Sequence, residues 1–554
     1  MRKSIIIAGC IVTMLLGYTG YRGYQVWKQS HWLVMANDCA AKGDLRNELL
    51  CLQQALRLNP QNQEACRLMA NLADALHSPG ALIWRQRLVD LNPKSVADRL
   101  ALAQTAMTLK DFALASNALA AVDDSGKNTA NYQNAAGVLA TGAGHLSEAE
   151  AHFTEAVRLD PANPILIMNL AVLRLNGTDT LDQASARIDL QRITLNSTNP
   201  AICSQARREL VVDAIRQDDL DGALNLVKNL VQSTNAQFSD RLMQLDLLQR
   251  TKSPEYKTTL ASCEREAAEN PAKLSDMTIW LMQRPSVAEA LTWLQSLPMQ
   301  IQTNQPAALL AAQCQVQLRY WLGMQTALQK QNWGELDFMR HAFLSRALRG
   351  QDLNDASSSE WVVAQKYAGD QKGSLISLLR LAAEWKWDSE AEQILWIVVK
   401  RYPEEKWATP ILAQTLMTSG RTRPLMQLFA ILSSRSPDDL ELKNNLAFTA
   451  MLLGAQEINP FDLAQEVYAK SPKNPTYAAT YAFSLYLQKQ TAQALKVMQQ
   501  LAPKDLDDPS IAGYYGLILK ATGDNAKAAI YLRRASGGQL LPEERKLFSL
   551  AESQ

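Results

Sequence analysis

Few residues in this sequence could hold a metal ion or transfer a proton. Of five histidines, His145 and His152 are seven residues apart, with Glu148 between them. On a helix this spacing places the two imidazoles two turns apart on one face, where they could ligate a metal. His145 sits at an expected turn, so we interpret the group as a solvated helix face and predict no metal site.

Motifs for nucleotide binding, nucleophilic attack and metalloprotease chemistry are absent from the sequence. It has no Gly-x-x-x-x-Gly-Lys-Ser/Thr loop, Gly-x-Ser-x-Gly elbow, His-Glu-x-x-His helix or Cys-x-x-Cys pair. The acidic group Asp218, Asp219 and Asp221 precedes an expected helix, where carboxylates cap free N–H groups. We predict no catalytic residues, no cofactor and no enzymatic activity; an enzyme site in the central region is the minor alternative.

The seven cysteines form no framework of regularly spaced pairs, and small apolar packing is our interpretation for them. Three cysteines fall in the first two expected repeats. If the protein lies outside the cytoplasm, a disulfide between two of these three is an alternative, and the sequence does not identify the pair. Those three are Cys39, Cys51 and Cys66; the isolated ones include Cys203, Cys263 and Cys314.

Composition favours a helical protein that binds no nucleic acid. The 56 basic and 55 acidic residues nearly cancel, whereas phosphate binding needs a concentrated positive field. Hydrophobic residues make up 47% of the chain, with only 24 Gly and 21 Pro, which leaves little room for long disordered segments. Apolar residues recur every three or four positions, as in Leu45, Leu49, Leu52 and Leu56. We predict an all-α fold.

Helix-terminating prolines recur with one period near both ends of the chain. Pro60, Pro93 and Pro161 are separated by 33 and 68 residues, the second gap being two units of 34. Separations of 34 and 35 residues occur among Pro403, Pro437 and Pro472. A period of 34 residues is typical of a repeated helix-turn-helix unit.

The clearest unit ends at Pro161, with small Ala149 and Ala156 flanking Phe153 on its second helix. Gly137, on the first helix, lets the two helices approach. This pattern resembles the tetratricopeptide repeat (TPR) family. The resemblance implies a right-handed superhelical α-solenoid, in which each hairpin buries its apolar face against its neighbours.

The resemblance is clear for residues 31–232 and 380–536 and weak between them. A last unit carries the same packing residues, Gly516, Ala528, Leu532 and Ala535. The central stretch is rich in Trp, which we interpret as core packing, with an aromatic groove as the alternative. We expect a basic segment at 1–4, a transmembrane anchor at 5–27, a TPR array at 28–235, divergent helical repeats at 236–380, a second TPR array at 381–540 and a capping helix at 541–554.

The N-terminus resembles a single membrane-spanning anchor. Arg2 and Lys3 precede 17 uncharged residues, Ile5 to Tyr21, which reach about 26 Å as a helix. A cleaved signal peptide and lipidation at Cys10 remain as alternatives. The basic residues on the two sides differ little; we expect the N-terminus inside and the repeats outside the cytoplasm, on the periplasmic side in a bacterium.

The resemblance implies that exposed side chains of the first helices line a concave groove for partner proteins or peptides. TPR domains that clamp chaperone C-termini use Lys, Asn and Arg on successive first helices; Asn169 matches one position, but the preceding repeat has Asn134 and Val138 instead, which disfavours such a clamp. The residues expected to face the groove are Asn131, Asn134, Val138 and Thr141 in the clearest repeat, and Ser510, Leu517 and Lys520 in the last.

These features predict a membrane-anchored TPR scaffold that assembles an envelope complex for secretion, pili, polysaccharide or cell wall. The alternative is a cytoplasm-facing TPR regulator of a membrane enzyme or protease. Self-association stays open, because the end of a stack of repeats exposes an apolar face unless a polar cap covers it.

Overall fold

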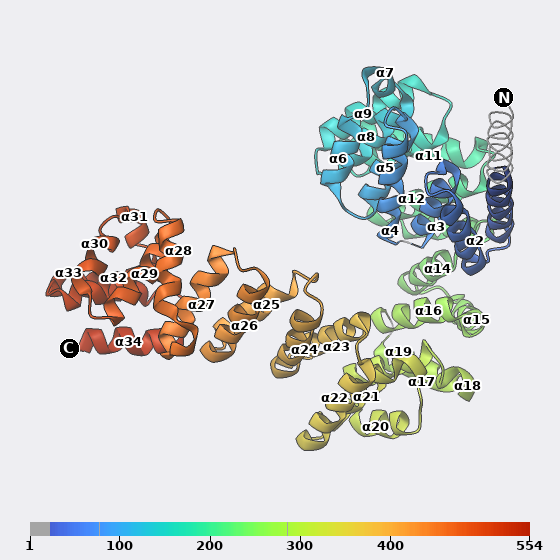
Figure 1. The fold of residues 1–554 in the computed structure, drawn as a ribbon. Helices are drawn as coiled ribbons and strands as arrows, with labels where there is room; N and C mark the ends of the chain where they lie inside the picture. Colours follow the sequence, from blue (N-terminus) through green and yellow to red (C-terminus); the bar gives the residue numbers. More distant parts are fainter. Residues whose placement is uncertain (1–22, 77, 285, 554) are drawn as a thin grey trace, which may run out of the picture. The chain divides into compact units, whose positions relative to one another are not determined.

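The computed structural model describes residues 23–76, 78–284 and 286–553, and within these ranges it contains helices and no strand. The chain divides into two compact units, unit 1 (Met1–Ser286) and unit 2 (Val287–Gln554). In each unit consecutive helices pack against each other as antiparallel hairpins (Figure 1). The prediction of an all-α protein built from sequential hairpins is confirmed.

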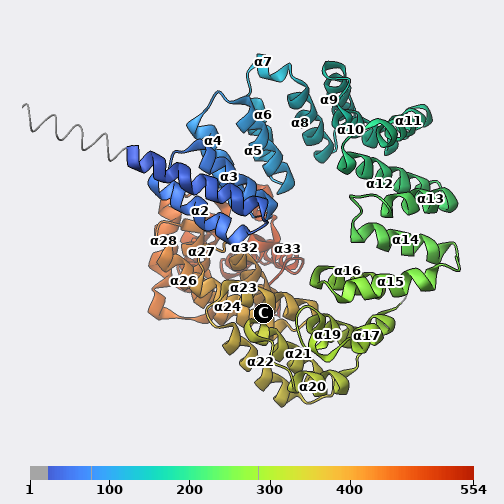
Figure 2. The same ribbon diagram turned by 90° about the vertical axis from the view of Figure 1, so that its right-hand side faces the viewer.

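In its described part, unit 1 starts with a helix over residues 23–41 and continues through successive hairpins that follow an arc (Figure 2). Its further helices are α2 (Leu45–Leu58), α3 (Gln63–Ala75), α4 (Gly80–Leu91), α5 (Val96–Thr108), α6 (Phe112–Ala120), α7 (Asp124–Lys127), α8 (Ala130–Gly142), α9 (Leu146–Leu159), α10 (Pro164–Leu175), α11 (Thr180–Asn196), α12 (Pro200–Arg216), α13 (Leu220–Val231), α14 (Phe238–Arg250), α15 (Tyr256–Ala268) and α16 (Pro271–Gln283).

Unit 2 repeats the hairpin pattern and ends with a helix that returns onto the preceding ones. Its elements are α17 (Val287–Ser296), α18 (Met299–Gln302), α19 (Ala307–Gln317), α20 (Trp321–Gln329), η1 (Gly334–Leu336), α21 (Asp337–Arg349), α22 (Asn354–Ala368), α23 (Lys372–Glu384), α24 (Asp388–Arg401), α25 (Ala408–Thr418), α26 (Thr422–Arg435), α27 (Leu440–Leu453), η2 (Gln456–Ile458), α28 (Pro460–Lys470), α29 (Pro475–Leu487), α30 (Thr491–Met498), α31 (Pro503–Leu506), α32 (Pro509–Ala521), α33 (Asn525–Ala535) and α34 (Pro542–Ser553).

Short polar side chains start many of these helices. Asn62 Oδ1 accepts a hydrogen bond from the Ala65 N–H at 2.8 Å at the start of α3. Asp219, from the acidic group 218–221, accepts one from the Gly222 N–H at 2.9 Å and caps α13. The interpretation of that acidic group as a helix cap is therefore confirmed, because the carboxylate satisfies an N–H that has no partner inside the helix.

Many of the turns inside the hairpins contain a residue in the left-handed backbone conformation. Four of them follow one another at hairpin turns in the first half of unit 2 and beyond: Arg319, Asp352, Lys386 and Gly420. Their separations are 33, 34 and 34 residues, from 352 − 319, 386 − 352 and 420 − 386. The hairpin period seen near the chain ends therefore also runs through the region where proline marks are missing.

Most of the central tryptophans lie in the core of unit 2. Trp361 is 2% exposed and meets Trp387 edge to face, with ring centroids 5.6 Å apart. Trp385 packs against Trp387 at 5.0 Å, and the Arg346 guanidinium lies over both rings. The core interpretation of these aromatics is confirmed, and the side chains meet one another instead of lining a groove.

The predicted anchor falls almost entirely outside the described residues. The segment 1–4 and residues 5–22 of the expected span 5–27 belong to that part, and residues 23–27 begin the helix over 23–41. Among the residues that the structure describes, no helix combines the length and apolarity needed to cross a membrane.

The six cysteines within the described ranges carry free thiols. Cys51 of α2 is buried, and this burial raises the pKa of its thiol, with the neighbouring Cys39 adding to the shift. Burial also raises the pKa of Cys66. Raised pKa values keep these thiols protonated and of low reactivity, which agrees with a packing role.

Candidate functional site

The α8–α9 hairpin brings its helices close through one glycine. A Cβ on Gly137 would lie 2.6 Å from two ring atoms of Phe153, so only Gly allows this approach. Phe153 is 4% exposed, and Ala149 and Ala156 are fully buried beside it. Pro161 follows the end of α9 and is exposed. The contact fixes how α8 is presented on the opposite side of the hairpin.

A hollow of about 340 Å³, which we call the unit 1 groove, lies between α5 and α8. Asn131, Asn134 and Val138 of α8 line one wall, and Gln104 and Met107 are among the α5 residues that line the other. Three of the four residues expected to face a groove in this repeat are thus brought together. The fourth, Thr141, is exposed near the end of α8 but does not line the hollow, and its hydroxyl donates to the Gly137 carbonyl at 2.8 Å.

Side chains in this hollow differ in their freedom to bind. Asn134 Oδ1 accepts a hydrogen bond from Asn169 Nδ2 of α10 at 2.7 Å, which links neighbouring first helices. Asn131 and Val138 are exposed, Val138 by 37%. Exposed apolar and amide groups on one wall suit contacts with a partner chain.

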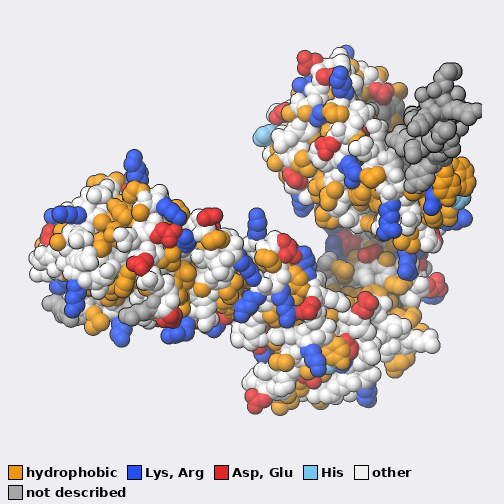
Figure 3. All heavy atoms as spheres, viewed as in Figure 1, with side chains coloured by type: hydrophobic (Ala, Val, Ile, Leu, Met, Phe, Trp, Pro, Cys, Tyr) orange, Lys and Arg blue, Asp and Glu red, His pale blue; other side chains and the backbone are white. Residues whose placement is uncertain are grey.

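A second, more polar hollow lies beside the first, since both are lined by Ala101 and Gln104 of α5. Here Arg85 pairs with Asp74 at 2.6 Å, and the Thr105 hydroxyl donates to the same carboxylate at 2.9 Å. The charges at this end of the groove thus neutralise each other. On the face drawn in Figure 3, Lys and Arg are interspersed with Asp and Glu over both units.

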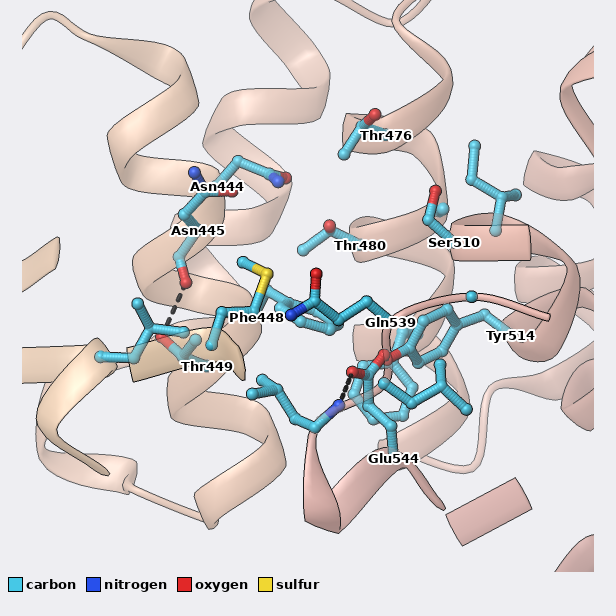
Figure 4. A pocket seen from close by; sticks show the side chains of 18 of the residues that line it. Asn444, Asn445, Phe448, Thr449, Thr476, Thr480, Ser510, Tyr514, Gln539 and Glu544 are labelled. Atoms are coloured by element: carbon cyan, nitrogen blue, oxygen red, sulfur yellow. Dashed lines mark hydrogen bonds between the residues drawn. The ribbon is translucent and has the colours of Figure 1, made fainter. Parts of the chain in front are cut away.

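Unit 2 contains a partly open pocket of about 240 Å³, shown in Figure 4. Helices α25, α26, α27, α29 and α32 form its walls, and the segment 538–541 with the start of α34 completes it. Phe429, Phe448, Phe483 and Tyr514 give it an aromatic interior. The pocket also has hydroxyl and amide groups, from Asn444, Asn445, Thr449, Thr476, Thr480, Ser510 and Gln539.

The three groove residues expected in the last repeat lie in different environments. Ser510 is exposed and lines the pocket, and Lys520 is half-buried. Leu517 is 2% exposed and packs in one cluster with Phe548 of α34. The structure therefore places Leu517 in the core instead of on an open groove, because α34 returns over the face of α32 that the repeat pattern alone would leave open.

Helix α34 is held by a buried carboxyl and by one aromatic ring. Glu544 accepts hydrogen bonds from the Tyr514 hydroxyl and, at 2.8 Å, from the Leu541 N–H. Burial raises the pKa of Glu544, although both hydrogen bonds act to lower it. Phe548 packs where a Cβ on Gly513 would lie 2.4 Å from its ring. The other packing residues of this repeat, Gly516, Ala528, Leu532 and Ala535, are all buried.

Nothing in the described ranges assembles into a metal site: no three His, Cys, Asp or Glu side chains come close enough to share an ion. Glu148 lies between His145 and His152, 3.5 Å from the first and 3.8 Å from the second, and His152 also contacts Gln133. His341 pairs with Glu360 at 2.6 Å and stacks on Tyr367. This arrangement packs α21 against α22 and opens onto neither hollow.

Comparison with known proteins finds likeness to solved structures, whereas no family model and no curated protein matches the chain. A TPR protein from Parabacteroides merdae is 16% identical over 40% of this chain and 83% of its own, with a TM-score of 0.35. PilF of Pseudomonas aeruginosa is 13% identical over 40% and 99%, with a TM-score of 0.31.

A structure of the APC/C hetero-tetramer Cut9–Hcn1 is similar over more of the chain. It is 11% identical over 92% of this chain and 96% of its own, with a TM-score of 0.28. TM-scores and identities this low assign the chain to no family. The description of its fold therefore depends on its own helices and their packing.

Proposed function

We propose that this protein is a membrane-tethered scaffold of TPR-type hairpins, wound as a right-handed superhelix in each unit, that binds partner proteins or peptides. The observation that carries the proposal is the groove lined by α5 and α8, where Asn131 and Val138 of the α8–α9 hairpin are exposed. The groove has neutral amide and apolar walls and no grouping of catalytic side chains. Such a surface recognises a polypeptide by shape and hydrogen bonding.

The tether in this proposal is the uncharged segment within residues 5–27. Its apolar length supports a single span. We propose that the N-terminus lies inside, so that both units lie outside the cytoplasm, on the periplasmic side in a bacterium. Anchoring concentrates bound partners at the membrane surface. We propose assembly of an envelope complex as the process that this arrangement serves.

Site-specific photo-crosslinking in native membranes tests the proposal. A photoreactive residue at Val138 should give a dominant adduct with a partner protein. Ile188 of α11, on a second helix and 56% exposed, provides the matched control and should give none. Adducts with envelope-assembly proteins outside the cytoplasm support the scaffold; cytoplasmic partners would reverse the orientation, as in a regulator of a membrane enzyme or protease. Equal labelling at both positions would reject the groove.

A further inference from the structure

One residue that lines the pocket of unit 2 has a buried polar atom without a hydrogen-bond partner. Asn444 of α27 is 2% exposed, and its Oδ1 is buried without a donor. Buried side-chain oxygens are paired in most folded proteins, because an unpaired one loses its hydration without compensation. Asn444 lines the pocket, so a molecule that enters it can supply the missing donor.

The remaining lining determines which kind of molecule fits. Phe429, Phe448 and Phe483 offer apolar contact around the pocket. The ionisable groups that line it, Glu544 and Tyr514, are already hydrogen-bonded to each other. A charged group that entered would lose its hydration and find no free counter-ion. The pocket therefore selects an uncharged apolar group that carries an N–H or O–H.

Access to the pocket is marked by exposed residues on its edge. Thr476, Ser510 and Gln539 line it and are exposed, whereas Asn444 and Thr480 are buried. Figure 4 shows the side chains of Asn444, Thr480 and Gln539 projecting toward one shared space. A ligand can thus enter past the polar edge and reach the buried acceptor.

The size of the pocket limits the ligand further. Its volume of about 240 Å³ is below the roughly 300–1,000 Å³ of pockets for drug-sized ligands. We propose that it binds one large uncharged side chain of an extended partner segment, whose backbone N–H donates to Asn444 Oδ1. This inference rests on the proposed function and names the chemistry of the partner at one site.

Binding of capped amino acids to the full-length protein tests this inference without any native partner. N-acetyl-phenylalaninamide supplies the apolar ring and the N–H, and N-acetyl-glutamic acid amide is the charged comparison. Saturation-transfer NMR should show binding of the first probe and not of the second. Asn444→Leu should weaken binding by about tenfold, the effect of one hydrogen bond to a desolvated acceptor, without lowering the thermal midpoint. Asn131→Leu, in the unit 1 groove, is the matched control and should bind normally.

A second variant tests the inference independently, in case Asn444→Leu does not fold. Ser510→Trp places a bulky side chain on the exposed edge, away from the core, and should abolish binding. Failure of the phenylalanine probe to bind, equal binding to Asn444→Leu, or equal binding of the charged probe would overturn the inference. None of these results affects crosslinking at Val138, so failure here is distinguishable from failure of the proposed function.

Discussion

A methyl group added at position 137 should destabilise the α8–α9 hairpin. The new Cβ would lie 2.6 Å from the ring of Phe153, which is 4% exposed and packs in a core cluster with Ala140, Ala149 and Leu170. Overpacking costs about 1–3 kcal/mol, and a separation so far below the 3.5–4.0 Å of ordinary carbon contacts places this case at roughly 2–3 kcal/mol. Replacing Gly by Ala inside a helix returns about 1 kcal/mol. The net loss for Gly137→Ala is therefore about 1–2 kcal/mol.

The same substitution at Gly373 should raise the stability of its helix instead of lowering it. Gly373 lies in α23, is exposed, and has no atom within 4 Å of the Cβ it would gain. Gly373→Ala should therefore stabilise its helix by about 0.4–1 kcal/mol, because it restricts the unfolded chain without a clash. The pair separates the effect of space from the intrinsic preference of the residue.

Hydrogen–deuterium exchange with mass spectrometry measures both effects locally, because hairpins of a repeat protein can open separately. Peptides from α8 and α9 should exchange about 5–30-fold faster in Gly137→Ala, and those from α23 more slowly in Gly373→Ala. Phe153→Leu should relieve the clash, with a coupling of about 1–2 kcal/mol in the double-mutant cycle. Unchanged exchange in Gly137→Ala, or strictly additive effects, would refute the reasoning.

Three further outcomes follow from the packing. Burial raises the folded-state pKa of Glu544 above the ordinary 4.5. The contribution of the protonated Glu544 to the free energy of unfolding is therefore fully present below pH 4.5 and is lost as pH rises through the folded-state pKa. Glu544→Gln should remove this decline, which urea denaturation at a series of pH values measures. Asp240 is 1% exposed and accepts from Arg208 at 2.7 Å, so Asp240→Ala should cost about 3–5 kcal/mol by leaving a partly buried guanidinium unpaired, a loss that thermal unfolding detects. Val138→Asp should abolish partner crosslinking from a probe at Asn131, while stability changes by no more than about 0.5 kcal/mol because the site is exposed.

The hairpin architecture could be predicted where residue types mark it. Pro161 and the pair Gly137 and Phe153 define a unit because helix ends and close helix approach restrict the residue that fits. The central region gave no such marks. Its left-handed turn residues are Arg319, Asp352 and Lys386, and residues other than Gly adopt this conformation too rarely for their types to reveal it.

The candidate sites were predictable only in part. Asn131 and Val138 follow from their place on a first helix, and they line the groove in unit 1. The same reasoning placed Leu517 in the groove, but the structure buries it. The repeat period gives no information about a helix such as α34, which follows the last repeat and packs back onto it. The unpaired Asn444 oxygen could not be predicted at all, because hydrogen-bond partners depend on side-chain packing in three dimensions.

The return of α34 changes how the end of this protein should fold. A stack of hairpins that touch only their neighbours can fray from its terminus one hairpin at a time. Here Thr422, at the start of α26, donates to Glu543 across 121 residues of chain, and α34 also contacts α27, α32 and α33. These contacts close a long loop, so the helices from α26 through α33 should unfold together as one cooperative unit. Its formation must wait for a long-range encounter, so this end should fold slowly, and a protease that removed α34 would turn an all-or-none transition into gradual fraying.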